Sequence, residues 1–171
     1  MQKLLFLLLA AASLSARALD GVSLEAGTGN QGVHMARLGL QWDWQRKWLA
    51  ERDWRLGGYW DASIGAWNGG PDTVWDYGFT PTFRYERAAG GSPYVEAGIG
   101  VHYLSTVHVA STRDFSTRFQ FGDHVGVGLR FGPGGRYDLG LRLQHLSNGG
   151  IREPNPGINF LQLRFQLRFS G

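Results

Sequence analysis

The strongest constraint on this sequence is a strict alternation of apolar and polar side chains, seen most clearly near the C-terminus. In NFLQLRFQLRF (residues 159–169), leucines and phenylalanines take every second position, and Gln and Arg take most positions between them. Successive side chains of a β-strand point to opposite faces of the sheet. The pattern therefore predicts a strand with one apolar face and one polar face.

The same alternation recurs along the chain, and each segment that shows it is a predicted strand. These segments cover residues 38–44, 56–66, 79–86, 95–103, 119–131, 139–147 and 159–169. An initial strand is expected near Val22–Gly27, and a less clear one near Tyr103–Val109. Since no helix-period segment and no low-complexity linker interrupts the series, the chain is predicted to be one all-β domain of about eight strands.

The composition of the polar face indicates which way the strands face. It mixes Arg with Asp, Glu and Gln, whereas Lys3 and Lys47 are the only lysines in the chain. Arginines and carboxylates form bidentate pairs that suit a confined interior, and the Leu, Val, Phe and Ala of the other face suit lipid. Aromatic residues near segment ends, such as Trp42, Trp67 and Trp75, fit the interfacial girdles of membrane barrels.

These features favour an eight-stranded antiparallel transmembrane outer-membrane β-barrel over a soluble β-sandwich or a lipocalin-like barrel. The mean hydropathy of −0.24 is compatible with either class, because the alternating strands of a membrane barrel average out on a hydropathy scale.

The N-terminus has the three parts of a secretory signal peptide. MQK is positively charged, LLFLLLAAASL is apolar but too short to span a bilayer as a helix, and Ala16-Arg17-Ala18 is a small-x-small cleavage site. We expect residues 1–18 to be removed. Residues 19–171 are then a single barrel domain that crosses the outer membrane of a Gram-negative cell several times.

Composition and motifs exclude several classes of function. The chain has no cysteine, so disulfides and thiolate metal sites are excluded. No HxH or HExxH spacing suggests a metal site, and no cofactor is expected. The sequence pI of about 9.5 comes from arginines scattered among acidic residues, which argues against a nucleic-acid partner. Arg113, Arg118 and Arg152 fall in expected extracellular loops, where they are either solvated or close to lipid phosphates.

The segment YDLGLRLQHLSN carries the candidate catalytic residues. His145 and Ser147 have the same parity as Leu141 and Leu143, so period two places them on the apolar face of the strand. In a membrane barrel that face meets lipid, where a polar pair is costly unless it is hydrogen-bonded, lies near the interface or performs chemistry.

Two more polar residues share this outward parity. Asp123 is in step with Phe121 and Val125, and Asn159 is in step with Leu161. If the two strands joined by the turn at 132–137 pair as a hairpin, residue 145 lies opposite residues 123–125. Asn159 begins the last strand close by. We therefore expect Asp123, His145, Ser147 and Asn159 to form one outward patch near the extracellular rim.

Such a patch has the parts needed for ester hydrolysis. A serine requires a neighbouring base, and the base requires a third group that holds its tautomer. Asn148 and the backbone N–H groups of Gly149 and Gly150 are candidate oxyanion donors. The alternative is that His145 and Ser147 are ordinary polar residues at the rim of a non-catalytic structural or adhesion barrel.

The quoted residues resemble the PagL-type lipid A 3-O-deacylases of Gram-negative outer membranes. The resemblance rests on HLSNGGIREPNPGIN, which is similar to that family's His-x-Ser-Asn-x-Gly stretch followed by a Pro-Asn-x-Gly turn. It extends to RLGLQWDW, RLGGYWDA, YVEAGIGV and the Phe-x-Asp pattern at residues 121–123, and so covers essentially the whole mature chain.

The resemblance implies an eight-stranded barrel that acts as a serine hydrolase on lipopolysaccharide. It would remove the ester-linked 3-hydroxyacyl chain at position 3 of lipid A, with Ser147 as nucleophile, His145 as general base and acid, and Asn148 with the following glycines as oxyanion stabiliser. A homodimer is left open.

One position departs from the family pattern. The third member is usually a Glu just after the Pro-Asn-x-Gly turn, and this chain has Asn159 there. Either Asn159 orients His145 with a smaller electrostatic gain, or Asp123 supplies the charge from the adjacent strand.

Overall fold

The structure is a computed structural model that describes residues 18–51, 53–68, 70, 72–87 and 92–169. The expected signal peptide, except its last residue, lies outside these residues. None of the helices among them is long and apolar enough to cross a membrane.

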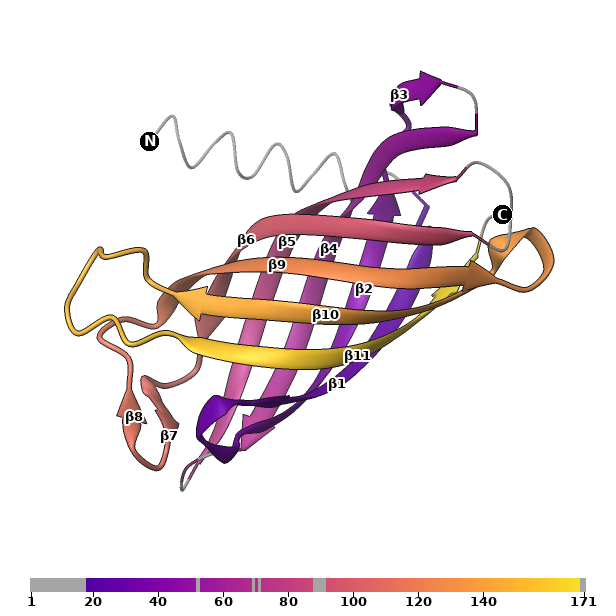
Figure 1. Cartoon of the computed structure of the whole chain (residues 1–171). Coiled ribbons are helices and arrows are strands. Elements are labelled where there is room, and N and C mark those ends of the chain that lie inside the picture. Colours follow the sequence, from indigo (N-terminus) through magenta and orange to yellow (C-terminus); the bar gives the residue numbers. More distant parts are fainter. Residues whose placement is uncertain (1–17, 52, 69, 71, 88–91, 170–171) are drawn as a thin grey trace.

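In the described part of the chain, eight antiparallel strands form a closed barrel (Figure 1). The barrel strands are β1 (Gly21–Gly29), β2 (His34–Asp43), β4 (Trp54–Asn68), β5 (Thr73–Arg87), β6 (Pro93–Leu104), β9 (Phe119–Phe131), β10 (Tyr137–Ser147) and β11 (Ile158–Arg168). Each of these strands pairs with the next barrel strand along the chain, so that β2 pairs with β4, and β1 pairs with β11 to close the barrel.

Three short strands lie at the two ends of the barrel. β3 (Trp48–Glu51) pairs with the start of β4. At the opposite end, which we call the outer end, β7 (His108–Ala110) and β8 (Arg113–Asp114) form a separate hairpin (Figure 1). The outer end also carries the short 3-10 turn Asn30–Gly32 and the loop between β10 and β11, whereas the 3-10 turn Pro133–Gly135 joins β9 to β10 at the other end.

The prediction of a strand near Tyr103–Val109 is wrong as a barrel strand. β6 ends at Leu104, and the residues that follow lead into the β7–β8 hairpin. Val109 and Ala110 are buried among apolar side chains at the mouth of the barrel. The apolar residues of this segment therefore reflect packing of the hairpin rather than passage through a membrane.

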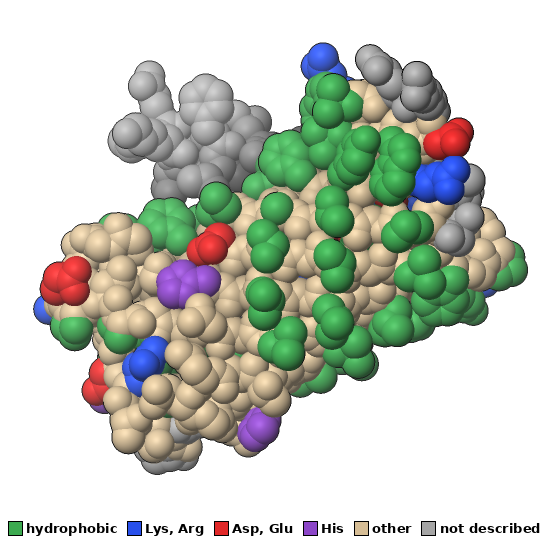
Figure 2. Space-filling model, viewed as in Figure 1, with side chains coloured by type: hydrophobic (Ala, Val, Ile, Leu, Met, Phe, Trp, Pro, Cys, Tyr) green, Lys and Arg blue, Asp and Glu red, His purple; other side chains and the backbone are tan. Residues whose placement is uncertain are grey.

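The predicted orientation of the strands is confirmed: the apolar residues point outward. Ile99, Val125 and Leu143 are 67%, 57% and 58% exposed, although they lie in the middle of strands. Figure 2 shows such side chains in rows over the wall, with most charged side chains at its two ends. A wall of this kind is stable only against lipid.

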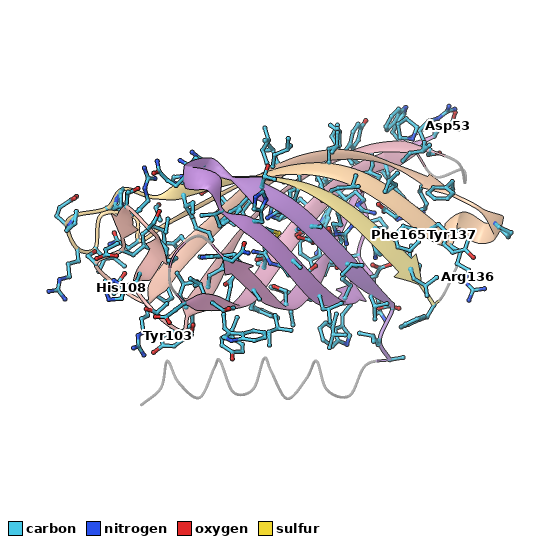
Figure 3. The ribbon with its side chains drawn as sticks, turned by 90° about the horizontal axis from the view of Figure 1, so that it is seen from below. Asp53, Tyr103, His108, Arg136, Tyr137 and Phe165 are labelled. Atoms are coloured by element: carbon cyan, nitrogen blue, oxygen red, sulfur yellow. The ribbon has the colours of Figure 1, made fainter. Side chains whose placement is uncertain are left out.

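Aromatic rings lie close to the ends of the apolar wall, as expected for interfacial girdles. Tyr137 and Phe165 stack with centroids 6.1 Å apart, at the end opposite to His108 (Figure 3). Trp54 and Tyr85 stack at 5.1 Å near the same end. Trp67 was also expected in a girdle, but its side chain is only 2% exposed and points inward, because its parity is that of the lumen face.

The middle of the lumen is filled by a network of arginines and carboxylates. The Arg142 guanidinium donates to Glu25 at 3.0 Å and to Glu96 at 2.7 Å. Arg84 donates to the same Glu96 at 2.8 Å and to Asp138 at 2.5 Å. Charges buried in this way are stable only when each is paired and hydrogen-bonded. The interior of this barrel is therefore ionic where the interior of a soluble domain is apolar.

The lumen changes character at the outer end, where an apolar cluster closes it. The cluster joins inward-facing strand residues to residues of the β7–β8 hairpin, and we call it the outer plug. Its buried members are Val33, Met35, Trp67, Val74, Leu104, Val109, Ala110, Phe115, Leu146, Ile158 and Phe160. The polar-face pattern did not predict this plug.

The ionic network makes a prediction about stability. Replacing Arg142 by Leu leaves Glu25 and Glu96 with one cationic partner fewer, and losing one partner of a buried ion pair costs about 3–5 kcal/mol. We expect the free energy of unfolding to fall by that amount in urea titrations of the protein in detergent micelles. The control is Arg87→Ala, which breaks the exposed pair with Asp53 and is expected to cost less than about 1 kcal/mol. Equal losses in the two variants would contradict a supporting role for the network.

Candidate active site

Strand register places three polar residues side by side on the outer wall. His145 of β10 lies directly opposite Asp123 of β9 on one side and opposite Asn159 of β11 on the other. The juxtaposition expected from alternation and hairpin arithmetic is thus confirmed. All three share the outward face, since the neighbouring Gln144 is buried in the lumen while Leu143 is exposed.

His145 is held by a hydrogen bond across the β10–β11 ladder. Its Nδ1 lies 2.7 Å from Oδ1 of Asn159. Because an amide oxygen only accepts hydrogen bonds, this contact requires the hydrogen on Nδ1, and in the neutral imidazole the lone pair then lies on Nε2. The imidazole therefore has the tautomer that a general base requires, with the basic nitrogen on the side away from Asn159.

Ser147 is the last residue of β10 and points to the same side of the strand as His145. The rise per residue puts the two Cα atoms about 7 Å apart, and both residues are half-buried. Within the described part of the chain, neither the Ser147 hydroxyl nor the Asp123 carboxylate makes a hydrogen bond. Catalytic hydrogen bonds are often long before a substrate binds, so the lack of a bond between Ser147 and His145 does not argue against a nucleophile–base pair.

The loop after Ser147 is held together by Asn148. Its side chain is 1% exposed, and its Nδ2 donates to Oγ of Ser116 at 2.8 Å and to the carbonyl of Arg152 at 2.7 Å. Its Oδ1 accepts the N–H of Gly150 at 2.9 Å. The amide of Asn148 is thus fully used in shaping the loop.

The same loop leaves one backbone donor available beside Ser147. The N–H of Asn148 donates to Oδ1 of Asn155 at 3.0 Å, and that of Gly150 is bound to Asn148. Of these three successive N–H groups, only that of Gly149 has no acceptor among the described residues. The oxyanion role of Asn148, Gly149 and Gly150 stays a prediction, and the geometry favours the Gly149 N–H as the donor.

Sequence reasoning missed several residues that shape the site. Asn155 caps the start of the loop, and Asn30 accepts the backbone N–H of Asn159 at 3.1 Å. Gly157 lies against the imidazole of His145, and Arg113 donates to the Gly157 carbonyl at 2.5 Å. The Pro-Asn-Pro-Gly run signals a turn, but no local pattern reveals which loops meet.

A groove on the outer wall begins at the site. Its volume is about 520 Å³, and Asp123, His145 and Asn159 line it together with Val125, Leu143 and Leu161. The same three apolar residues also line a second groove of about 510 Å³, which runs further along the wall. An apolar path thus leads from the polar patch along the barrel toward the middle of the apolar wall.

Fold and site together define a membrane β-barrel with a candidate Ser-His-Asn site on its outer wall. The family model for lipid A 3-O-deacylase (PagL) matches residues 34–168, and the chain belongs to that family. The resemblance seen in the sequence is thus confirmed.

Individual members of the family support this membership. The lipid A deacylase PagL of Pseudomonas aeruginosa is 38% identical over 156 residues, which cover 90% of this chain and 88% of that protein. The lipid A deacylase PagL of Bordetella bronchiseptica is 37% identical over 160 residues, covering 87% and 83%. The crystal structure of the outer membrane enzyme PagL superimposes with a TM-score of 0.79 at 36% identity, covering 86% of this chain and 98% of that one.

The hydrogen bond between His145 and Asn159 predicts a spectroscopic signature. At a pH where the imidazole is neutral, ¹⁵N spectra of histidine-labelled protein in micelles are expected to show His145 as the Nδ1–H tautomer. His145→Gln assigns the signal. In Asn159→Ala the signal is expected to move toward the average of the two tautomers, because the acceptor is gone. A predominant Nε2–H form in the unaltered protein would contradict the assignment.

Proposed function

We propose that this protein is an outer-membrane lipid A 3-O-deacylase that hydrolyses the ester-linked 3-hydroxyacyl chain at position 3 of lipid A. The observation that carries the proposal is the direction of the site. His145, Asn159 and Ser147 lie on the wall that faces lipid rather than in the lumen. A hydrolase of a membrane lipid needs its catalytic groups there, since the scissile ester lies near the boundary between headgroup and acyl chains.

In the proposed mechanism Ser147 is the nucleophile and His145 is the general base. Nε2 of His145 removes the proton of the Ser147 hydroxyl while Oγ attacks the ester carbonyl carbon. Asn159 keeps the proton on Nδ1, so that Nε2 stays the basic atom. The Gly149 N–H donates to the oxygen that becomes negatively charged in the tetrahedral intermediate.

The intermediate collapses when the C–O bond to the sugar breaks. The imidazolium returns its proton to the departing sugar oxygen, which becomes a hydroxyl group, and the 3-hydroxyacyl chain stays on Ser147. Water, deprotonated by His145, then attacks the acyl carbon, and the second tetrahedral intermediate collapses as the bond to Oγ of Ser147 breaks and His145 returns the proton to Oγ. The products are 3-O-deacylated lipid A and a free 3-hydroxy fatty acid.

The groove beside the site offers a place for the chain that is removed. Val125, Leu143 and Leu161 line the wall from His145 toward the middle of the barrel. An acyl chain descending from a headgroup at the outer end would follow this path and bury apolar surface against it. The phosphorylated sugars would then lie near the loops at the outer end.

Export and assembly follow from the same proposal. Residues 1–18 would direct the chain across the inner membrane and be removed, and the barrel would cross the outer membrane with each of its strands. Its outer end would face the cell exterior, because the longer loops of such barrels are extracellular. The homodimer left open by the sequence stays a prediction, which sedimentation in detergent tests.

Removal of either catalytic side chain is expected to abolish deacylation. In Ser147→Ala and His145→Ala we expect release of 3-hydroxy fatty acid from purified lipid A to fall by about 10³-fold or more. Mass spectrometry of lipid A from cells expressing each variant reports the loss of one acyl chain. Ser111→Ala, at an exposed serine of the β7–β8 hairpin, is the matched control and is expected to retain activity. Full activity of folded Ser147→Ala would refute the serine mechanism.

Substitutions on either side of His145 separate the two sources of support for the base. Asn159→Ala removes the orienting hydrogen bond and is expected to lower kcat by about 10- to 100-fold. Asn159→Glu keeps an acceptor and adds charge that stabilises imidazolium, which is expected to raise kcat by about tenfold. Asp123→Asn tests whether the carboxylate on β9 supplies that charge. Unchanged activity in Asp123→Asn would remove Asp123 from the mechanism, and unchanged activity in Asn159→Ala would remove Asn159.

A further inference from the structure

We propose that Arg113 of β8 is a positioning residue that holds the His145 imidazole in its catalytic place by fixing Gly157. The inference rests on the proposed function for its catalytic consequence, but the contacts that carry it are independent of any substrate. It concerns a residue of the β7–β8 hairpin, far along the chain from the site it serves.

Arg113 reaches across the outer end to the segment that precedes β11. Its Nη1 donates to the carbonyl of Gly157 at 2.5 Å and lies 3.4 Å from the carbonyl of Pro156. A guanidinium bound to backbone carbonyls makes charge-assisted hydrogen bonds, which are shorter and stronger than neutral ones. Gly157 is buried, so its carbonyl has no ready replacement for this donor.

Gly157 in turn forms the surface against which the imidazole of His145 rests. A Cβ at this position would lie 2.5 Å from Cε1 and 3.0 Å from Nε2 of His145. The backbone has φ of +60°, which glycine adopts without the steric cost that other residues meet. Gly157 therefore touches the edge of the ring that carries the basic nitrogen, while Asn159, two residues on, binds the opposite nitrogen.

Both contacts to the imidazole thus come from one short segment, residues 157–159. A shift of this segment moves the ring as a unit and changes the distance between Nε2 and Ser147. Misplacement of a catalytic group by about 1 Å is enough to lower a rate by about 100-fold. The segment therefore needs a fixed support at its outer side, and Arg113 supplies one.

The hairpin that carries Arg113 is well anchored and so can act as a support. Val109, Ala110 and Phe115 are buried in the outer plug. Ser116, two residues after β8, accepts a hydrogen bond from Asn148 and donates to the carbonyl of Arg152. The loop between β10 and β11 is therefore held near its start by Ser116 and near its end by Arg113.

The geometry distinguishes Arg113 from the other arginines of the outer loops. Arg118 and Arg152 are exposed, and neither side chain has a hydrogen-bond partner among the residues described here. They fit the expectation of solvated charges or contacts to lipid phosphates. Arg113 is half-buried and its donors are directed at the protein backbone.

The test compares Arg113→Ala with the matched control Arg118→Ala, using purified protein and lipid A in mixed micelles. Arg113→Ala is expected to lower kcat by about 10- to 100-fold and to leave KM within about twofold, because the loss concerns orientation rather than binding. Arg113→Lys, which keeps one donor, is expected to be intermediate. Addition of methylguanidinium is expected to restore part of the kcat of Arg113→Ala and to leave Arg118→Ala unchanged.

Two readouts keep a failure of this inference separate from a failure of the proposed function. If the unaltered protein releases no fatty acid from lipid A, the proposed function fails, and the ¹⁵N signal of His145 still tests the support. That signal is expected to shift in folded Arg113→Ala and not in Arg118→Ala. Three results for folded Arg113→Ala would each overturn the role of Arg113. They are an unshifted His145 signal, an unchanged kcat, and a rise in KM without a fall in kcat that Arg118→Ala shows as well.

Discussion

The pairing of arginines with carboxylates inside the barrel is the interaction on which the rest of this structure depends. Because most apolar side chains of the wall face lipid, the residues that the structure describes form no apolar core in the middle of the barrel. Arg84 and Arg142 are each held by carboxylates from more than one strand, and both bind Glu96. A slip of one strand by a single residue would turn such an arginine toward lipid and leave its partners unpaired. The ionic network therefore fixes the register of the whole barrel.

The register of the strands also brings the residues of the candidate active site together. His145 meets Asp123 and Asn159 only because β9, β10 and β11 pair in one particular alignment. A shift of two residues would keep every side chain on its proper face and yet separate the imidazole from its acceptor. The charged lumen and the outer-wall site are thus parts of one arrangement, although no lumen arginine touches the site.

The outer plug connects the two sides of the wall. Leu146 and Ile158 point into it, while their neighbours His145, Ser147 and Asn159 point out. The strand ends that carry the site are therefore packed from within by apolar side chains, including those of the β7–β8 hairpin. Rigid support behind catalytic groups is what keeps them in productive geometry. The β7–β8 hairpin takes part in this packing through Val109 and Ala110.

Much of this arrangement could be predicted from the sequence because alternation is a local signal. Period two revealed the strands, the lipid face and the outward direction of His145, and loop lengths then placed Asp123 and Asn159 beside it. Two expectations failed, for different reasons. Trp67 lies on the lumen face by its own parity, which the expectation of a girdle position passed over. The segment Tyr103–Val109 is placed by packing of the β7–β8 hairpin against the outer plug, and such contacts between loops have no period. Arg113 was expected to be a solvated charge or a phosphate contact for the same reason, since its acceptor lies 44 residues away.

In the proposed mechanism, the presence of Asn159 where the family resemblance implies an acid divides the support of His145 between several neighbours. The amide fixes the tautomer through Oδ1 and adds no charge beside the imidazole. The residue that orients His145 therefore does not also stabilise the imidazolium by charge, and steric support of the ring becomes more important in this mechanism. Gly157 provides that support at one edge of the imidazole, and Asp123 brings a carboxylate to its other side through strand pairing alone. Under the proposed mechanism, Asn159 sets the tautomer of His145, Gly157 supports its position, and Asp123 is the candidate source of charge.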